Sequence, residues 1–246
     1  KKIAFVHVDY EKAGYTRGLD MGDYHRFDKI FAVSEEITDP FLKVHPAMKD
    51  KVFVFENTID QKAIIEGSLN GRGFSDDYDG VRILTIGRLT AQKAYEVSIA
   101  AMKILKDRKV KARWYVLGEG VLHRELLSLI KKEGLEKDFI LLGAVQNPYP
   151  YLRECDVYVH ASRFEGKSIA LAEAKTLGCA IVASDVSGNR EQIKDSNNGL
   201  LCKLDAEDIA DKTEMLIKDR EFAGKLGENA SKEEIWGADP AVLLEM

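Results

Sequence analysis

Short apolar runs alternate along the chain with longer stretches in which apolar residues recur at helical spacing. Several of these runs are apolar throughout, as expected of strands that helices cover on both faces. The runs predicted to be strands are 3–8, 29–34, 51–56, 82–87, 113–118, 139–143, 156–161, 180–184 and 199–203. The predicted helices lie near 35–45, 60–67, 93–108, 120–134, 149–154, 167–177, 188–194 and 205–217. This alternation predicts an α/β fold, a Rossmann-like parallel sheet with helices on both faces.

The polar, glycine-rich stretch 68–82 is the clearest break in composition, and we place it at or near a domain boundary. Six of the nine predicted strands follow it, which is enough for a complete nucleotide-binding domain. We assign 1–58 to a short first unit, 59–218 to the nucleotide-binding domain and 219–246 to a helical tail that Pro240 interrupts.

Composition excludes several classes of protein. The chain has 45% hydrophobic and 31% charged residues, and 36 basic against 41 acidic residues give a net charge of −5. A general nucleic-acid binder needs a basic surface, so nucleic acid is not an expected partner. Three cysteines without C-x-x-C spacing argue against a disulfide framework or a zinc site and favour a reducing cytoplasm. No apolar run reaches about 18 residues, so no membrane span is expected, although peripheral attachment stays open.

Two cations follow the predicted strand that ends at Gly87, in "TIGRLTAQKAYE". Arg88 and Lys93 lie in the loop that leads into the next helix. Because ligands of open α/β sheets bind at the carboxyl ends of the strands, both cations lie where an anion would dock. Arginine can bind two phosphate oxygens at once, and lysine is a mobile point charge. The alternative is that both are solvated surface cations.

The loop 144–147 follows another predicted strand end, in "LLGAVQNPYPYL". Backbone groups there could bind the edge of a planar base. For Tyr149 and Tyr151 we favour packing roles in the following helix over base stacking.

Two glutamates, Glu165 and Glu173, lie eight positions apart in "RFEGKSIALAEAKTLG". Along a helix this spacing is about 12 Å, too far for the carboxylate pair of a retaining glycosidase. It suits a long ligand with an anionic middle, such as a sugar nucleotide. The diphosphate would bind the free N–H groups of the helix N-terminus, which belong to Gly166, Lys167, Ser168 and Ile169.

In that arrangement Glu173 would accept hydrogen bonds from the ribose, and Glu165 from the hexose. The alternative is that Glu173 is merely exposed, while Glu165 only favours the helix dipole.

The same stretch resembles the Glu-x7-Glu signature of retaining glycosyltransferases with the GT-B fold, family 4 of the sequence-based classification. Bacterial capsule, lipopolysaccharide and exopolysaccharide sugar transferases are the most similar members. The resemblance extends from about His7 to Lys218. It includes "FAVSEEI", "VFVFENTID", "ILTIGRLTAQK", "WYVLGEG", "LLGAVQNPYPYL" and "ASDVSGNREQI…NNGLL", in the order of the family.

The resemblance implies a role for each matching residue. Arg88 and Lys93 would hold the donor diphosphate and stabilise the leaving group, Glu165 would contact the transferred sugar, and His7 would lie near that sugar. The remaining donor-binding positions are Gly87 in the strand-end loop, Val145 and Gln146 at the base, Gly166, Lys167, Ser168 and Ile169 at sugar and phosphate, and Glu173 at the ribose. No metal or cofactor is expected, because the cations and the helix N-terminus supply the positive field.

Two departures from the family pattern stand out. Most of the N-terminal acceptor domain that precedes the "VHVDY" strand in the family is missing, so 1–58 resembles its last strands. Ala94 follows Lys93 where the family often has glycine, and we expect this to require only a slightly less tight turn.

The resemblance therefore predicts a retaining hexosyltransferase that uses a nucleotide-diphosphate sugar, with UDP favoured over GDP. The acceptor would be a glycan or a lipid-linked sugar of surface polysaccharide biosynthesis, in the cytoplasm or at the inner face of the membrane. Alternatives are a truncated chain that binds the nucleotide sugar without transferring it, and a sugar-nucleotide epimerase of related fold. An NAD-dependent dehydrogenase would need a complete G-x-G-x-x-G, which is absent.

Overall fold

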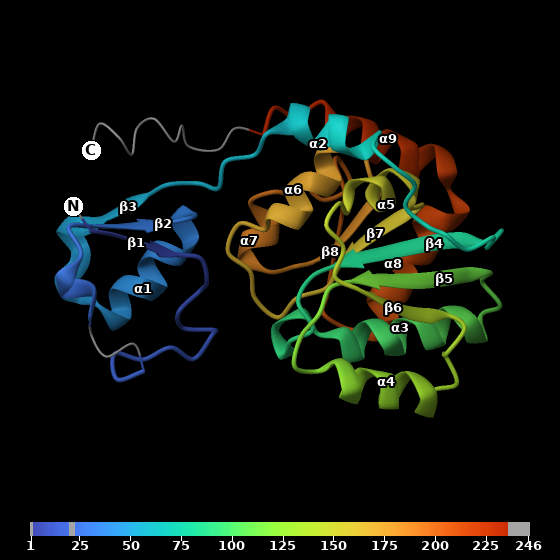
Figure 1. Cartoon of the computed structure of the whole chain (residues 1–246), viewed down its shortest axis with the longest axis horizontal. Coiled ribbons are helices and arrows are strands. Elements are labelled where there is room, and N and C mark those ends of the chain that lie inside the picture. Colours follow the sequence, from blue (N-terminus) through green and yellow to red (C-terminus); the bar gives the residue numbers. More distant parts are fainter. Residues whose placement is uncertain (1, 20–22, 236–246) are drawn as a thin grey trace.

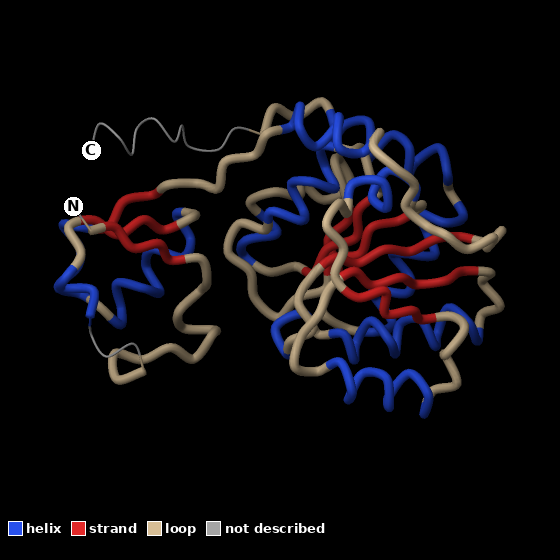
Figure 2. Tube along the Cα trace, viewed as in Figure 1, coloured by secondary structure: helices blue, strands red, loops and turns tan. Residues whose placement is uncertain are grey.

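The chain forms two parallel sheets flanked by helices, which confirms the expected α/β, Rossmann-like fold (Figures 1 and 2). This computed structural model describes residues 2–19 and 23–235. The three-stranded sheet has the order β1-β2-β3, and the six-stranded sheet has the order β6-β5-β4-β7-β8-β9. Pro240 and the end of the predicted tail lie outside the described residues.

The smaller sheet carries a compact aromatic core. Its elements are β1 (Ile3–Val6), a 3-10 turn (Asp23–Arg26), β2 (Lys29–Ala32), a 3-10 turn (Glu35–Ile37), α1 (Thr38–Val44), a 3-10 segment (Pro46–Lys51) and β3 (Val52–Val54). Phe41 is fully buried, and its ring centroid lies 5.0 Å from that of Tyr10 and 4.9 Å from that of Tyr24. The section therefore has a core of its own.

In the larger sheet, the first three strands along the chain are added toward one side, and the fourth returns to the other side of the first. Its strands are β4 (Val81–Ile86), β5 (Ala112–Leu117), β6 (Phe139–Gly143), β7 (Val157–His160), β8 (Ile181–Ser184) and β9 (Leu200–Cys202). Strands β5 and β6 extend from one side of β4, and β7 to β9 extend from the other. The register pairs Ile83 with Val157 and Leu84 with Tyr158. Ligands of such sheets bind beyond the strand ends at this switch point, here between β4 and β7.

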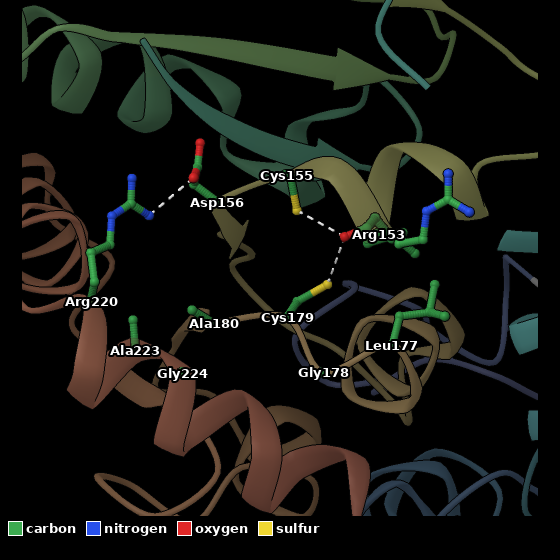
Figure 3. A pocket seen from close by; sticks show the side chains of 11 residues that line it. Arg153, Cys155, Asp156, Leu177, Gly178, Cys179, Ala180, Arg220, Ala223 and Gly224 are labelled. Carbon is green, nitrogen blue, oxygen red and sulfur yellow. Dashed lines mark hydrogen bonds and ion pairs between the residues drawn. The ribbon is translucent and has the colours of Figure 1, made fainter. Parts of the chain in front are cut away.

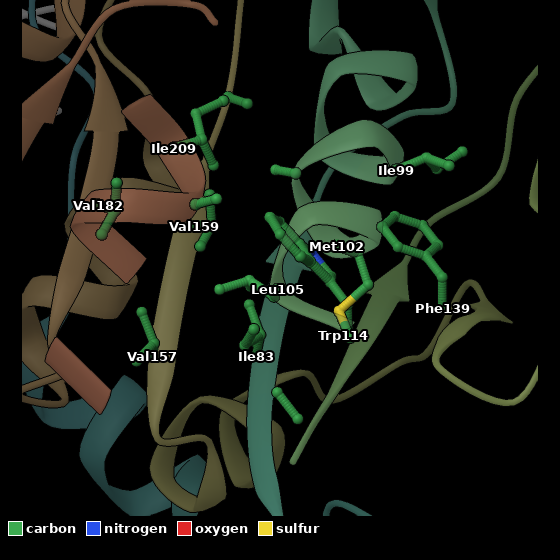
Figure 4. Close-up of a cluster of buried hydrophobic side chains, with 14 of the residues drawn as sticks. Ile83, Ile99, Met102, Leu105, Trp114, Phe139, Val157, Val159, Val182 and Ile209 are labelled. Carbon is green, nitrogen blue, oxygen red and sulfur yellow. The ribbon is translucent and has the colours of Figure 1, made fainter. Parts of the chain in front are cut away.

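Helices cover both faces of the larger sheet. On one face α3 (Tyr95–Asp107), α4 (His123–Lys132) and α8 (Ala206–Lys218) enclose the main apolar core, and on the other lie α5 (Tyr149–Glu154) and α6 (Ile169–Thr176). Trp114 is fully buried in the main core, beside Met102 and Phe139 (Figure 4). Its indole N–H donates to Oγ1 of Thr85 at 3.0 Å, so the polar edge of the ring is satisfied. Helix α9 (Arg220–Ser231) packs on α6 and α8.

Residues 55–60 connect the smaller sheet to α2 (Gln61–Ser68), which packs on α5 and α6. The following stretch, which the composition places near a domain boundary, lies against the larger sheet. There the Asp76 carboxylate binds Arg82 at 3.0 Å and Arg113 at 2.7 Å. The connection between the two sheets thus precedes α2.

Three predicted helices differ from the observed ones for local reasons. The segment 35–45 divides into the 3-10 turn and α1, and of 188–194 only α7 (Ser187–Arg190) overlaps the prediction. Helix α3 begins at Tyr95 because Ala94 adopts a left-handed conformation, with φ 44° and ψ 42°. The expectation of a slightly less tight turn at Ala94 was wrong, since this conformation costs a non-glycine residue about 1–2 kcal/mol.

Candidate functional site

The larger sheet brings Lys93 and Glu165 together, although they lie 72 residues apart in the chain. Lys93 ends the 3-10 turn Ala91–Lys93 beyond β4, and Glu165 lies in the loop between β7 and α6. Lys93 Nζ lies 2.5 Å from Glu165 Oε1, and the two side chains are only 14% and 8% exposed. The pair thus marks the switch point between β4 and β7.

The two oxygens of Glu165 are used unequally. Oε1 accepts hydrogen bonds from Lys93 Nζ and from Ser162 Oγ, each at 2.5 Å, and His160 Nε2 lies 3.4 Å from it. Oε2 has one long contact, 3.4 Å from Gln92 Nε2. Burial favours the protonated acid, but the His160 hydrogen bond and the Lys93 charge outweigh it and lower the pKa of Glu165 to about 2. The ionised carboxylate therefore keeps one oxygen largely available.

Helix α6 begins at Ile169, two residues later than predicted, so the expected backbone donors belong to the loop before the helix as well as to its N-terminus. The N–H groups of 166–169 have no acceptor among the residues that the structure describes. Ser168 is the N-cap, and its side chain accepts from the N–H of Leu171 at 3.4 Å. The Lys167 side chain extends to Glu56 in the connecting segment, at 2.6 Å. The helix end thus offers backbone donors, as expected for an anion site.

Three backbone segments stack closely at Gly166. A Cβ there would lie 2.6 Å from the carbonyl oxygen of His7, and a Cβ at Gly188 would lie 1.6 Å from the carbonyl oxygen of Gly166. The His7 main chain therefore lies next to the Glu165–Gly166 loop. Its side chain is exposed and stacks on Phe5, with centroids 5.9 Å apart.

Glu173 lies on α6 one turn beyond these donors and is half-buried. Tyr149 Oη donates to Glu173 Oε1 at 3.1 Å. Burial raises the pKa of Glu173, and the tyrosine hydrogen bond opposes this. Tyr149 also packs against α2, where a Cβ at Gly67 would lie 2.6 Å from its ring. The packing role expected for Tyr149 agrees with this contact, and the hydrogen bond adds to it.

A pocket of about 170 Å³ lies between the carboxyl ends of β4, β5 and β6. Its lining residues are Ile86, Gly87, Leu117, Gly118, Ala144, Val145 and Pro148. Gly118 has φ +148°, and a Cβ there would lie 2.0 Å from the carbonyl oxygen of Gly87. Only glycine permits this approach of the two loops.

Two of the predicted residues are not engaged in this arrangement. Arg88 and Gln146 are both exposed, and neither side chain has a hydrogen bond or ion pair with any described residue. The structure brings together Lys93, Glu165, the α6 N-terminus and the main chain of His7. It places Arg88 in the loop before Lys93 without a contact to the pair.

Sequence reasoning missed His160, Ser162 and Gln92. His160 ends strand β7 in "DVYVHA". After Asp156, only Tyr158 and His160 carry titratable side chains in this otherwise apolar segment. Tyr158 and His160 are two positions apart, so they share a face of the strand. Gln92 gave no signal, because its contact with Glu165 arises from the meeting of two distant loops. Ser162 contacts Glu165 within a single loop, whose fold the sequence pattern does not specify.

A second pocket, of about 260 Å³, lies at the amino ends of the strands, away from the proposed site (Figure 3). It lies near the residues that precede β7 and β8. The thiols of Cys155 and Cys179 both donate to the carbonyl oxygen of Leu152, at 3.3 and 3.2 Å. Arg220 pairs with Asp156 at 3.0 Å on its rim. This pocket shares no residue with the Lys93–Glu165 site.

No group of three or more His, Cys, Asp or Glu side chains within 2–19 and 23–235 is arranged to hold a metal ion. Among these same residues, no helix combines the length and apolar character needed to cross a bilayer.

Comparison with known proteins identifies the fold and the family of the chain. The family model described as Glycosyl transferases group 1 matches residues 76–233. An N-acetylgalactosamine-N,N'-diacetylbacillosaminyl-diphospho-undecaprenol 4-alpha-N-acetylgalactosaminyltransferase of Campylobacter jejuni is 36% identical over 75% of this chain and 49% of its own length. The chain thus spans about half the length of this curated relative.

Solved structures agree. The crystal structure of HepE from Anabaena in complex with UDP-glucose superposes with a TM-score of 0.78 at 18% identity, over 93% of this chain and 66% of that one. The C-terminal domain of LpcC, a glycosyl transferase group 1 family protein from Francisella tularensis, gives a TM-score of 0.59 at 26% identity, over 70% and 94% of the two chains. The expected GT-B type of fold is confirmed.

Proposed function

We propose that this chain, which belongs to the family of group 1 glycosyl transferases, binds a nucleotide-diphosphate sugar. This sugar would be the donor of a retaining hexosyl transfer. One observation supports this most directly. The Lys93–Glu165 pair, a cation and a carboxylate 2.5 Å apart, lies beside the N–H groups of 166–169, which have no acceptor among the described residues. A phosphate and a sugar hydroxyl are the groups that these two features would bind.

The diphosphate would lie against the N–H groups of 166–169, with Lys93 on its other side. A helix N-terminus and a lysine together provide both directed hydrogen bonds and a point charge. Arg88 is exposed and unengaged in the same loop, so its guanidinium is free to join them. These groups would stabilise the negative charge that develops on the departing nucleoside diphosphate.

The sugar would lie on the other side of the diphosphate, at Glu165. Its Oε1 is occupied by Lys93 and Ser162, whereas Oε2 has only the long contact with Gln92. Oε2 is therefore the oxygen that would accept from a sugar hydroxyl, and the Gln92 amide is its neighbour. The main chain of His7 lies beside this loop, which would place the smaller sheet against the transferred sugar.

The nucleoside would extend the opposite way. Glu173 is half-buried on α6, and its carboxylate would accept from the ribose hydroxyls. The pocket beside Gly87 and Val145 would receive the base. The HepE structure that superposes on the chain is a complex with UDP-glucose, which supports uridine as the base.

Lys93 would then have two anionic partners. In the structure its ammonium neutralises Glu165, and a bound diphosphate would share this cation. The proposed site needs no metal ion at the diphosphate, because Lys93, Arg88 and the helix N-terminus carry the positive charge.

For the acceptor, we propose a glycan or lipid-linked sugar of surface polysaccharide biosynthesis. The name of the Campylobacter jejuni relative includes a diphospho-undecaprenol acceptor, which supports this class. An acceptor of this kind is held in a membrane, so we also propose that the protein acts at a membrane surface, on the inner face. Binding without transfer is the second candidate, because the chain spans only about half the length of that relative.

Titration calorimetry with UDP, GDP, UDP-glucose and UDP-N-acetylgalactosamine tests donor binding. We expect UDP and at least one UDP-sugar to bind, equally in the presence of Mg²⁺ and of EDTA. Failure of every nucleotide to bind would overturn the proposal. Incubation with radiolabelled UDP-sugar and a polyprenyl-diphosphate-linked acceptor then separates transfer from binding alone.

A further inference from the structure

His160 is buried directly beside Glu165 and is only 1% exposed. Its Nε2 atom lies 3.4 Å from Glu165 Oε1, and its Nδ1 atom lies 3.2 Å from the hydroxyl of Tyr158. Tyr158 is itself fully buried. The three side chains thus form a line from the interior of the sheet to the carboxylate of the site.

Burial and the nearby Lys93 ammonium lower the pKa of His160, so the imidazole is neutral at physiological pH. A neutral imidazole carries its proton on one nitrogen, and the partner of the other nitrogen selects which. The hydroxyl of Tyr158 has no other hydrogen-bond partner among the described residues. If it donates to Nδ1, the proton lies on Nε2 and points to Glu165.

The opposite tautomer is disfavoured on both sides of the ring. Nδ1–H would donate to the Tyr158 oxygen, which would leave the buried phenolic proton without an acceptor. The Nε2 lone pair would face the Glu165 carboxylate at 3.4 Å. Lys93 Nζ carries three protons and lies 3.5 Å from Nε2 and 2.5 Å from Glu165 Oε1, so its contact with an Nε2 lone pair would be the longer and weaker of the two. A buried donor without an acceptor destabilises that arrangement.

We propose that His160 is a positioning residue that acts through Glu165, an inference that rests on the proposed function. Its Nε2–H, together with Ser162 and Lys93, holds Oε1 and thereby leaves Oε2 to bind the sugar of the donor. Tyr158 fixes the imidazole tautomer that makes this hydrogen bond possible. The line Tyr158–His160–Glu165 would orient the carboxylate before any donor binds.

The tautomer is tested without any ligand. In a long-range ¹⁵N–¹H NMR spectrum of ¹⁵N-histidine-labelled protein, we expect His160 to show a protonated Nε2 and an unprotonated Nδ1 at neutral pH. The signal is assigned by its loss in His160→Gln. A protonated Nδ1 would overturn the proposed tautomer and with it the hydrogen bond from His160 to Glu165, whether or not the protein binds a nucleotide sugar.

The positioning role is tested by two variants of the same residue. His160→Gln keeps an amide donor, while His160→Leu keeps bulk without a donor. We expect His160→Leu to weaken binding of the tighter of UDP-glucose and UDP-N-acetylgalactosamine about tenfold, with UDP affinity changed less than twofold. His160→Gln should recover most of the loss.

The exposed His123→Leu is the matched control and should change neither affinity. Equal losses of UDP and UDP-sugar binding in His160→Leu, or no rescue by His160→Gln, would show that His160 only packs. If the unaltered protein binds UDP but neither UDP-sugar, the proposed donor function fails, and the NMR result still decides the tautomer.

Discussion

The hydroxyl of Tyr149 donates to the Glu173 carboxylate at 3.1 Å and so joins α5 to α6. Tyr149 also packs on α2, so this side chain of α5 contacts two further helices around the proposed ribose site. The carboxylate is held in a partly desolvated position, where its pKa is raised above the ordinary value of 4.5. The proposed binding residue is thus kept in place at a cost to stability.

Glu173→Gln should therefore stabilise the fold at pH 8. The folded-state pKa is higher than the unfolded one, so the buried charge destabilises the protein as pH rises above about 4.5. Glutamine keeps an acceptor for Tyr149 and removes the charge. Thermal unfolding at pH 8 and pH 4 should show a higher midpoint for the variant only at pH 8. An equal difference at both values would contradict the assignment.

Glu165→Gln should have the opposite effect. The pKa of Glu165 falls from 4.5 to about 2, so its charge stabilises the fold above pH 4.5 and this contribution is lost as pH falls towards 2. The difference corresponds to about 3 kcal/mol at pH 7. Urea unfolding should show the gap between the two proteins closing from pH 5 to pH 2. A gap independent of pH would mean that the charge is not the cause.

Lys93→Ala should weaken UDP binding at least tenfold. The variant loses a charged hydrogen bond to the diphosphate, which contributes about 1.5–3 kcal/mol. Lys103→Ala is the control, because Lys103 lies on α3 and pairs with Asp107 at the surface. Calorimetry, with circular dichroism as a check on folding, measures both. Unchanged affinity in Lys93→Ala would refute the phosphate role.

Gly188→Ala should destabilise the protein strongly, because the new methyl group would lie 1.6 Å from the carbonyl oxygen of Gly166. Gly224→Ala is the matched control on α9, where a Cβ meets nothing within 4 Å. Replacing a helical glycine by alanine there should stabilise by about 0.5–1 kcal/mol. Unfolding midpoints that move in the same direction would contradict the stacking of the two loops.

Ala94→Gly should raise stability by up to about 1 kcal/mol. It relieves about 1–2 kcal/mol of left-handed strain and adds less than about 1 kcal/mol of unfolded-chain entropy. Ala94→Val should destabilise, because a β-branched residue is even less tolerant of φ 44°. Chemical unfolding of the unaltered protein and the two variants gives the order of their free energies of unfolding. A glycine variant less stable than the alanine protein would show that packing of the buried methyl group dominates.

The strands were predictable because each is a short apolar run, and all nine are found within a few residues of the predicted positions. The parallel sheet followed from their alternation with helices. The end of the Gly87 strand and the start of the α6 helix were also placed correctly to within two residues. These features depend on local composition, which a single sequence contains.

The contacts of the site were less accessible. The pairing of Lys93 with Glu165 arises from strand order, which brings distant loops together, and the contact of His160 with Glu165 depends on the fold of the loop after β7. Ala94 was misjudged because burial and the start of α3 impose a backbone conformation that its side chain disfavours. The roles proposed for the individual site residues stay predictions until the variants are measured.

The placement of β4 next to β7 also sets a schedule for biosynthesis. Lys93 leaves the ribosome 72 residues before Glu165, which at typical translation rates is roughly 4 to 14 s. During that interval the ammonium has no carboxylate partner, and one edge of β4 has no neighbouring strand. Protease digestion of translation-arrested chains should show β4 protected only once β7 has been synthesised.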